Sequence, residues 1–293
     1  MTLTTTDPHW LRPDLAYRYE FEPDELEDMS QCVKAHGFAV VKGVIPIEHV
    51  EQLKSSIDQV LNPHRDLEPG QTRVSHGFVE FSPPLLKLFD NSAWLAIHET
   101  LTGTREMTVH RSAAILKNAG CPAGAWHTDW SFNNGPPLNS GDVLNRGEHP
   151  SGKWFYLSGT HPARGGLAVI EDSHRIDWEG PPGFEFTEGR RSFYPRGTEP
   201  KAYAGMDVPG VVPLFTDPGD MIIFAARTYH GVFPHNGDEP RYSCALGFRP
   251  HRRPWPVPWP IPESARKLRA NLPPRLRPYF EHYTSIVSNW RPA

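Results

Sequence analysis

AWHTDWSF at residues 125–132 and ARTYHGVFPHNGDEPRYS at 226–243 are the stretches of this sequence that decide its fold and its chemistry. Side chains alternate between the two faces of a β-strand, so the first stretch predicts that His127 and Asp129 project from one face. His230, in the second stretch, would supply a third ligand from a strand distant in the sequence. Two histidines and one carboxylate form the ligand set of many non-haem Fe(II) sites, in which other metal positions stay open.

Arg241 and Ser243 follow His230 in PRYSCALGF, whose alternation predicts a strand. A planar guanidinium donates two parallel hydrogen bonds to a carboxylate, so we expect Arg241 to clamp the distal carboxylate of 2-oxoglutarate. Ser243 would share that face of the strand and add a hydroxyl to the same carboxylate. Both are therefore candidate cofactor-binding residues.

The order of these motifs resembles that of the phytanoyl-CoA dioxygenase family of Fe(II)/2-oxoglutarate-dependent oxygenases. The resemblance spans roughly residues 24–250 and is weak over 131–153 and 177–208. The segments that carry it are HTD at 127–129, GGLAVIEDSHR at 165–175, DPGDMIIF at 217–224, YHGV at 229–232, Arg241, and the opening GFAVVKGVIPIEHVEQLKSSID at 37–58.

The resemblance implies a mainly β fold, the double-stranded β-helix or cupin-like jelly roll, with N-terminal helices. It implies Fe(II), 2-oxoglutarate and O2 as cofactors, and His127, Asp129 and His230 as metal ligands and catalytic residues. The implied reaction oxidises an unactivated C–H bond of a small metabolite and releases succinate and CO2. Because Asp129 is present, hydroxylation, desaturation or ring closure is favoured over halogenation, for which similar enzymes carry a small residue at this position.

Other residues are expected near the site, although each also has an ordinary explanation as a core or surface residue. Lys117 and His110, on the strand before the H-x-D motif, are candidates for contact with 2-oxoglutarate. The candidates for contact with the substrate are Trp130, Phe132, Trp154 and Arg227.

Composition narrows the class of protein. The chain has 293 residues and a net charge of −4, without an extended basic block, so nucleic-acid binding is not expected. No apolar run is long enough to span a membrane, and the N-terminus lacks the features of a signal peptide. The three cysteines, Cys32, Cys121 and Cys244, are widely spaced, which favours a reducing cytoplasm over a disulfide framework.

Periodicity and turn residues predict one domain over residues 1–293, with a helical region at 1–105, a jelly-roll core at 106–250 and a C-terminal helical extension at 251–293. Glycine and proline are abundant, as is usual for many short strands joined by turns. Helices are predicted at 24–36, 46–61 and 84–101, and within 262–290. Strands are predicted at 38–42, 106–117, 124–130, 153–158, 166–171, 211–215, 220–226 and 241–249.

Two long segments rich in turn residues, 131–153 and 180–207, are expected to line the mouth of the barrel and to act as lids. In the second segment the candidate contacts to substrate are Phe184, Phe186, Phe193, Tyr194 and Tyr203. The alternative is that these aromatic side chains pack on the outer barrel wall or on a second subunit.

Two other classes of function remain open. A His/Asp/His site can hold zinc and activate water for hydrolysis, and a non-catalytic protein on the same fold could bind a small molecule. Arg241 and the GGL…SHR context favour the oxygenase. A small secondary metabolite is the preferred substrate, and both a monomer and a homodimer are compatible with the sequence.

Overall fold

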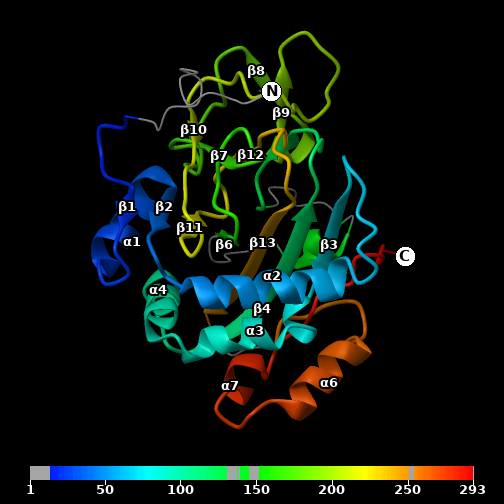
Figure 1. Cartoon of the computed structure of the whole chain (residues 1–293). Helices are drawn as coiled ribbons and strands as arrows, with labels where there is room; N and C mark the ends of the chain where they lie inside the picture. The colour runs from blue at the N-terminus through cyan, green and yellow to red at the C-terminus, as the bar shows by residue number, and fades with distance from the viewer. Residues whose placement is uncertain (1–13, 131–136, 138, 145–151, 251–253, 293) are drawn as a thin grey trace.

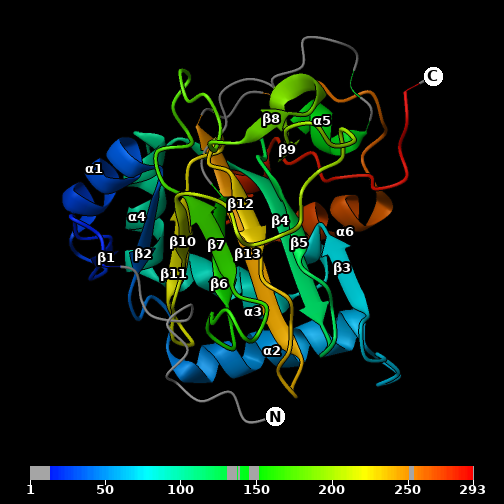
Figure 2. The same cartoon turned by 90° about the horizontal axis from the view of Figure 1, so that it is seen from above.

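The computed structural model of the protein describes residues 14–130, 137, 139–144, 152–250 and 254–292. Two sheets face each other, and helices cover the outer side of the larger one (Figures 1 and 2). This arrangement is the mainly β, jelly-roll fold that the sequence predicts, with helices at both ends of the chain.

The larger sheet has seven strands, paired antiparallel except for β1 with β2. Its order is β1 (Glu20–Phe21), β2 (Phe38–Val41), β11 (Met221–Phe224), β6 (Gly152–Tyr156), β13 (Arg241–Pro250), β4 (Met107–Lys117) and β3 (Thr72–His76). The smaller sheet has the order β10 (Val211–Pro213), β7 (Leu167–Ile170), β12 (His230–Val232) and β5 (Gly124–His127). A separate hairpin joins β8 (Phe184–Phe186) to β9 (Phe193–Pro195).

The N-terminal helices are α1 (Leu26–His36), α2 (Ile47–Leu61), α3 (Pro83–Leu86) and α4 (Ser92–Thr102). In Figure 1, α2 runs across the larger sheet, and α4 packs on β13. After the strands come α6 (Glu263–Asn271) and α7 (Arg277–Phe280), and short α5 (Ser140–Leu144) lies between β5 and β6 in the sequence. Single 3-10 turns occupy Phe78–Glu80, Lys87–Asp90 and Glu188–Arg190.

The β2 strand is an apolar strand that is enclosed on both faces. Its sequence, FAVV, is buried along its whole length because helices and β11 enclose it. Gly37 ends α1 in the left-handed conformation, with a φ of 86°, and its N–H donates to the carbonyl of Val33. A Cβ at Gly37 would lie 2.6 Å from Nδ1 of His174, so the tight change from helix to strand requires glycine.

The single helix predicted over 84–101 is wrong, because the structure breaks it at Asn91. The side-chain oxygen of Asn91 accepts a hydrogen bond from the backbone N–H of Trp94, which caps α4. Its amide donates to the carbonyl of Val44 at 2.7 Å. The polar side chain therefore starts a new helix and fixes it to the β2–α2 connection.

One predicted strand is too long, and one edge strand was not predicted. The strand predicted over 124–130 ends at His127, and Asp129 lies in the bend that follows. The edge strand β3, TRVSH, was not predicted because it lacks a clear apolar alternation, and Val74 is 45% exposed.

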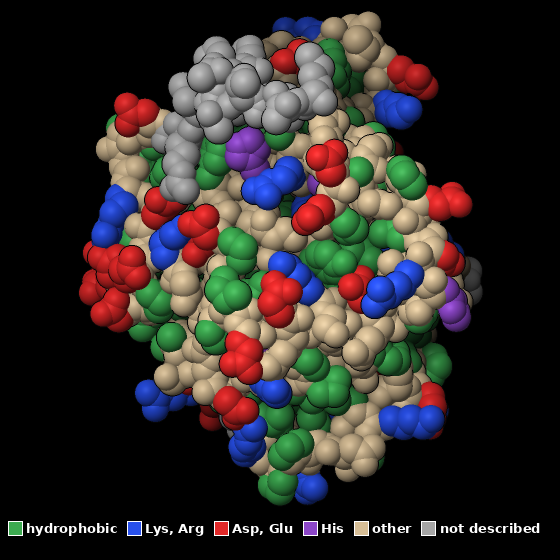
Figure 3. Space-filling model, in the orientation of Figure 1, with side chains coloured by type: hydrophobic (Ala, Val, Ile, Leu, Met, Phe, Trp, Pro, Cys, Tyr) green, Lys and Arg blue, Asp and Glu red, His purple; other side chains and the backbone are tan. Residues whose placement is uncertain are grey.

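The buried side chains form two clusters. The larger one fills the space between the helices and the seven-stranded sheet. The smaller one lies on the outer side of the four-stranded sheet and includes Trp126, Phe193 and Tyr229. None of the described helices is both long and apolar enough to cross a membrane. On the face shown in Figure 3, acidic and basic side chains are interspersed rather than separated by sign.

We predict that Asp220 stabilises the turn before β11. Its buried carboxylate accepts hydrogen bonds from the backbone N–H groups of Gly43 and Asp217, both at 2.8 Å, and from the ammonium of Lys42. An amide would place N–H groups against these donors, so Asp220→Asn should lower the free energy of unfolding by about 1–3 kcal/mol.

The exposed Asp217 is the matched control, because its side chain also pairs with Lys42, at 3.1 Å. Asp217→Asn should cost less than about 1 kcal/mol. Urea denaturation of the two variants measures the difference, and equal losses of stability would contradict the assignment.

Candidate active site

His127, Asp129 and His230 come together between the two sheets. β5 pairs antiparallel with β12, and this register makes His127 and His230 direct cross-strand partners. Their ring centroids are 4.2 Å apart. One donor atom from each of the three residues lies within 4.8 Å of the other two, so a single small ion could contact all three.

Both imidazoles are oriented by backbone carbonyls two residues earlier in the chain. Nδ1 of His127 lies 2.9 Å from the carbonyl oxygen of Ala125, and Nδ1 of His230 lies 3.0 Å from that of Thr228. A carbonyl can only accept, so each Nδ1 carries the proton and donates it. Each Nε2 is left with a lone pair, as in metal sites whose histidines are held by an outer hydrogen bond.

Asp129 lies in a bend that two hydrogen bonds of the preceding residue, Thr128, hold in place. The hydroxyl of Thr128 donates to the carbonyl of Ala226 at 2.8 Å, and the backbone N–H of Thr128 donates to the carbonyl of Arg191. The alternation of the strand continues past its end, since Trp126 and Thr128 are buried away from the cavity while His127 and Asp129 line it. Asp129 therefore owes its place to these loop contacts and not to a strand ladder.

The site favours neutral histidine. The pKa of the His230 imidazole is lowered to about 4, mainly by burial and then by the neighbouring His127, whereas the Asp129 carboxylate acts in the opposite direction. A neutral imidazole is the form that binds a metal. The donor set and its protonation therefore suit a divalent ion.

The glycine of the HG motif has a packing role. A Cβ at Gly231 would lie 3.0 Å from the indole of Trp126. That indole donates to the carbonyl of Gly205 at 2.8 Å and belongs to the smaller buried cluster. Glycine therefore allows the Trp126 ring to pack directly over β12, next to His230.

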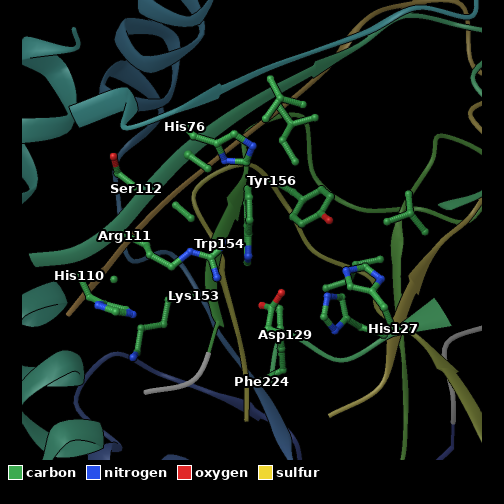
Figure 4. A pocket seen from close by; sticks show the side chains of 18 of the residues that line it. His76, His110, Arg111, Ser112, His127, Asp129, Lys153, Trp154, Tyr156 and Phe224 are labelled. Carbon is green, nitrogen blue, oxygen red and sulfur yellow. The ribbon is translucent and has the colours of Figure 1, made fainter. Parts of the chain in front are cut away.

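A cavity of about 280 Å³ extends from the three residues between the sheets (Figure 4). β4 and β13 form its floor, because alternate residues of each strand face it. Trp154 and Phe224 line it from β6 and β11. Its apolar walls also include Ala113, Ile115, Tyr156, Leu167, Val232 and Ala245.

Arg241 and Ser243 precede Ala245 on the cavity-facing side of β13. Arg241 is buried, its Nη1 donates to the carbonyl of Gly165, and its guanidinium lies 4.9 Å from the ring centroid of Tyr156. Arg241 does not itself line the cavity, but the ring of Tyr156 that it contacts does. Among the described residues, Nε of Arg241 and Oγ of Ser243 are buried without a hydrogen-bond partner. Two orphaned polar atoms from residues on the same face of β13 suit a carboxylate ligand.

Lys117 and His110 occupy opposite ends of β4. Lys117 is the cross-strand partner of Arg241, and burial together with the Arg241 charge lowers its pKa to about 8. At the other end a register shift follows Gly247, and His110 is the extra residue. His110 faces the cavity there, and its Nε2 lies 3.0 Å from the carbonyl of Leu144. The structure thus brings Lys117, but not His110, to Arg241.

The residues predicted to contact substrate are dispersed. Trp154 lines the cavity. Trp130 and Arg227 stack on each other, with the guanidinium 4.1 Å from the indole ring centroid, and neither is part of the cavity wall. Phe132 lies outside the described residues.

The prediction that the aromatic side chains of 180–207 face the substrate is wrong. Phe184, Phe186, Phe193 and Tyr203 pack with Tyr229 on the outer side of the four-stranded sheet, which is the alternative considered for them. Hydrophobic burial against that sheet removes these rings from water. Tyr194 lies on the hairpin and donates to Glu185. Of the other proposed lid, residues 131–136, 138 and 145–151 lie outside the described residues.

Three ionisable residues of the cavity wall were not predicted from the sequence. Arg111 alternates with Ala113, Ile115 and Lys117 on β4, so the strand period could have revealed it. Lys153 and His76 gave no signal, because the first is a buried lysine in an apolar strand and the second lies on the edge strand that was not predicted.

A second group of possible metal-ligating side chains lies where the end of α1 meets the turn after β7. His36, Glu171 and Asp172 lie close enough to share an ion. Asp172 already pairs with Arg175 at 3.3 Å and with His36 at 3.4 Å. These ion pairs explain why the three side chains lie together, so we assign no metal to the cluster.

Comparison with known proteins places the chain in a family. The model of the phytanoyl-CoA dioxygenase family matches residues 33–243. The chain therefore belongs to this family, and it is an oxygenase-type enzyme that depends on iron and 2-oxoglutarate. A search of curated protein sequences gives no match.

Solved structures show the same fold. The epimerase SnoN, in complex with Fe3+, alpha ketoglutarate and nogalamycin RO, is 19% identical with a TM-score of 0.57, over 78% of this chain and 84% of SnoN. HygX from Streptomyces hygroscopicus, with nickel and 2-oxoglutarate bound, is 17% identical with a TM-score of 0.55, over 75% and 85%. EvdO2 from Micromonospora carbonacea var. aurantiaca, complexed with 2-oxoglutarate, is 18% identical with a TM-score of 0.55, over 85% and 100%.

We predict that His127→Ala weakens the binding of Ni(II) or Co(II) while the fold is kept. The loss should exceed the about 10- to 100-fold that follows removal of an outer hydrogen-bond partner, because a donor atom itself is removed. Calorimetric titration measures the affinity and circular dichroism the fold. The exposed His64 provides the control variant His64→Ala, and equal metal affinities of the two variants would refute the assignment.

We predict that Lys153 makes stability depend on pH. Burial lowers the pKa of its ammonium to about 7. Between about pH 7 and the ordinary value near 10.5 the unfolded chain holds more protons at this residue, so the free energy of unfolding rises with pH. Lys153→Met should be more stable than wild type at pH 7, and this advantage should shrink at pH 9.

Urea denaturation at the two pH values measures the effect. Lys201→Met, at an exposed lysine, is the control and should follow the wild type at both. A Lys153→Met variant with the same pH dependence as the wild type would show that this ammonium is not desolvated.

Proposed function

We propose that this enzyme uses Fe(II), 2-oxoglutarate and O2 to hydroxylate an unactivated C–H bond of a small-molecule metabolite. The observation that carries the proposal is the convergence of His127, Asp129 and His230, with both Nε2 lone pairs available, in one cavity. Tyr156, which contacts Arg241, forms part of the wall of this cavity. The proposed roles are those of metal ligands for the first three and of a carboxylate clamp for Arg241, assisted by Ser243.

The residues present suit these two cofactors. Two imidazoles and one carboxylate match the facial ligand set of non-haem iron, which leaves positions for further ligands. Nε of Arg241 and Oγ of Ser243 supply the unused hydrogen-bonding capacity that a distal carboxylate would satisfy. Lys117, the cross-strand partner of Arg241, adds positive charge beside it.

When bound, iron and 2-oxoglutarate would supply the oxidising chemistry, with succinate and CO2 as co-products. The chain's own residues hold and orient the reactants. Ala125 and Thr228 fix the imidazoles through their carbonyls, and Thr128 fixes the bend that carries Asp129. The apolar walls, with Ile115 and Leu167 among them, exclude water from the reacting carbon.

Enzymes with this fold differ in the product that forms at the oxidised carbon. SnoN is described as an epimerase and SnoK, an 18% identical structure, as a carbocyclase, so related folds direct the oxidation to different products. We propose hydroxylation or a related oxidation here because Asp129 is retained. Mass spectrometry of the product distinguishes an added oxygen atom from ring closure, desaturation or epimerisation.

The partner we propose is a small molecule rather than a nucleic acid or a membrane. The mixed surface charge on the face in Figure 3 supports this proposal. The cytoplasm is the proposed location, because the three cysteines are free and buried and so suit a reducing compartment. Both a monomer and a homodimer are compatible with the proposed site.

We predict that Arg241→Lys raises the dissociation constant of 2-oxoglutarate by about tenfold or more. An ammonium lacks the planar fork, and hydrogen bonds to charged groups contribute about 1.5–3 kcal/mol. Calorimetry on the Ni(II)-loaded protein measures the constant. Arg175→Lys, outside the cavity, is the control, and an unchanged affinity in Arg241→Lys would remove this residue from the proposed site.

The choice of metal separates the proposed oxygenase from a zinc hydrolase. We expect protein loaded with Fe(II) to convert 2-oxoglutarate to succinate in air, at least slowly without substrate, and protein loaded with Zn(II) not to do so. His230→Ala should abolish the conversion. Succinate is measured by chromatography, with an anaerobic reaction as control. Succinate formation that is equal with both metals, or that survives without air, would exclude the proposed function.

A further inference from the structure

The residues on the inner face of the larger sheet form rows that run across its strands, from β3 through β4 and β13 to β6. In one row the successive cross-strand partners are Val74, Ile115, Ser243 and Tyr156. In the next row they are His76, Ala113, Ala245 and Trp154. All of these residues except Ser243 line the cavity (Figure 4).

The second row has small side chains in its middle and large ones at its ends. Ala113 and Ala245 extend no further than Cβ, whereas His76 and Trp154 flank them on β3 and β6. Ile115, in the first row, stands higher beside Ala113. The two alanines are therefore the bottom of a channel across β4 and β13. Neighbouring strands are about 4.8 Å apart, so a row across four strands spans roughly 14 Å.

The channel meets solvent at the edge of the larger sheet. β3 is the last strand of that sheet, and on its inner face Val74 is 45% exposed and His76 is also exposed. Its other face packs toward α2, where Arg73 donates to the carbonyl of Leu61 at 3.0 Å. β5, which carries His127, is the last strand of the smaller sheet. Among the described residues the cavity therefore opens between β3 and β5 (Figure 2).

The walls of the channel are suited to an apolar ligand. Val74 and Ile115 supply branched aliphatic side chains along one side of it, and Trp154 supplies a large aromatic ring at its inner end. Leu167 and Val232 face the floor from the smaller sheet. An apolar group in this space would be removed from water on both sides, which is the arrangement that favours its binding.

The polar residues of the cavity wall are engaged or uncharged. His110, Arg111 and Lys153 each interact with other groups of the protein. Asp129 is assigned to the metal under the proposed function. Partial burial, and then the charge of Arg111, lower the pKa of the His76 imidazole below its usual value, so this ring is uncharged at neutral pH. The surface that the channel offers to a ligand is therefore mainly apolar.

We propose that the substrate of this enzyme has an apolar segment, which lies in the channel over Ala113 and Ala245 and leaves the cavity over β3. The inference rests on the proposed function, because it takes Arg241 and Ser243 as the clamp for 2-oxoglutarate and so assigns the next row to the substrate. The segment would pass between the floor and the metal ligands on the smaller sheet. Substrates of this class are apolar or amphiphilic metabolites, and a polar part would remain in solvent beyond β3.

The test uses protein loaded with Ni(II) and saturated with 2-oxoglutarate, and ligand-observed NMR measures the dissociation constants of three probes. Two of them are butan-1-ol and heptan-1-ol. The third, 2-(2-methoxyethoxy)ethanol, has as many heavy atoms as heptan-1-ol but two ether oxygens in place of methylene groups. Heptan-1-ol should bind about tenfold or more tightly than either of the others, because each methylene that is fully buried strengthens binding by about fourfold.

Two variants with matched controls locate the site. Ala113→Leu would fill the channel and should weaken the binding of heptan-1-ol by about tenfold or more, because a close-packed leucine leaves no room for the probe. Ala270→Leu, at an exposed alanine of α6, is its control. Val74→Thr keeps the shape of the side chain but turns a hydroxyl toward the ligand, and should weaken binding by about fivefold or more. Ile47→Thr, at an isoleucine of α2 that is 58% exposed, is its control.

Thermal unfolding confirms that each variant is folded, and a loss of binding in either folded variant that its control does not show supports the inference. The inference is overturned if heptan-1-ol binds the wild type no more tightly than the diether, or if both folded variants bind heptan-1-ol as the wild type does. Calorimetry on the same samples measures the affinities for Ni(II) and 2-oxoglutarate and so tests the proposed function separately. A protein that binds both but shows no preference for the apolar probe refutes only the substrate class. A protein that binds neither refutes the proposed function itself.

Discussion

The antiparallel pairing of β5 with β12 is the constraint on which the rest of the site depends. Its register places His127 beside His230, and the carbonyl groups of Ala125 and Thr228 each accept a hydrogen bond from Nδ1 of one of the two rings. A slip of β5 by one residue would send the His127 imidazole to the opposite face of the sheet, where the cluster around Trp126 lies. The packing of Trp126 over Gly231 therefore stabilises the geometry of the site as well as the fold.

The cavity extends along two strands of the larger sheet. Because β4 and β13 pair over a long register, their cavity-facing residues form a continuous floor with Lys117 and Arg241 at one end and Arg111 at the other. Small residues occupy the middle of this floor, and the metal-binding candidates stand above it on the smaller sheet.

The two sides of the smaller sheet have different roles, and the hairpin of β8 and β9 acts on the outer side. Its aromatic residues cover the outer side, and the carbonyl of Arg191 holds Thr128 beside Asp129. Arg191 also pairs with Asp142 in α5. The hairpin therefore acts on the site by fixing the bend that carries a ligand, while the substrate space lies on the inner side of the sheet.

The jelly-roll fold and the candidate roles of the H-x-D motif, the HG motif and Arg241 could be predicted from the sequence, because they follow from local alternation and from the order of motifs along the chain. The positions of Asn91, Lys153 and His110 in the structure could not be predicted in this way. Asn91 breaks a helix through a contact with a distant carbonyl, Lys153 is buried in a strand of apolar pattern, and a bulge carries His110 to the end opposite Arg241. Such outcomes depend on partners remote in sequence, and local periodicity contains no information about them.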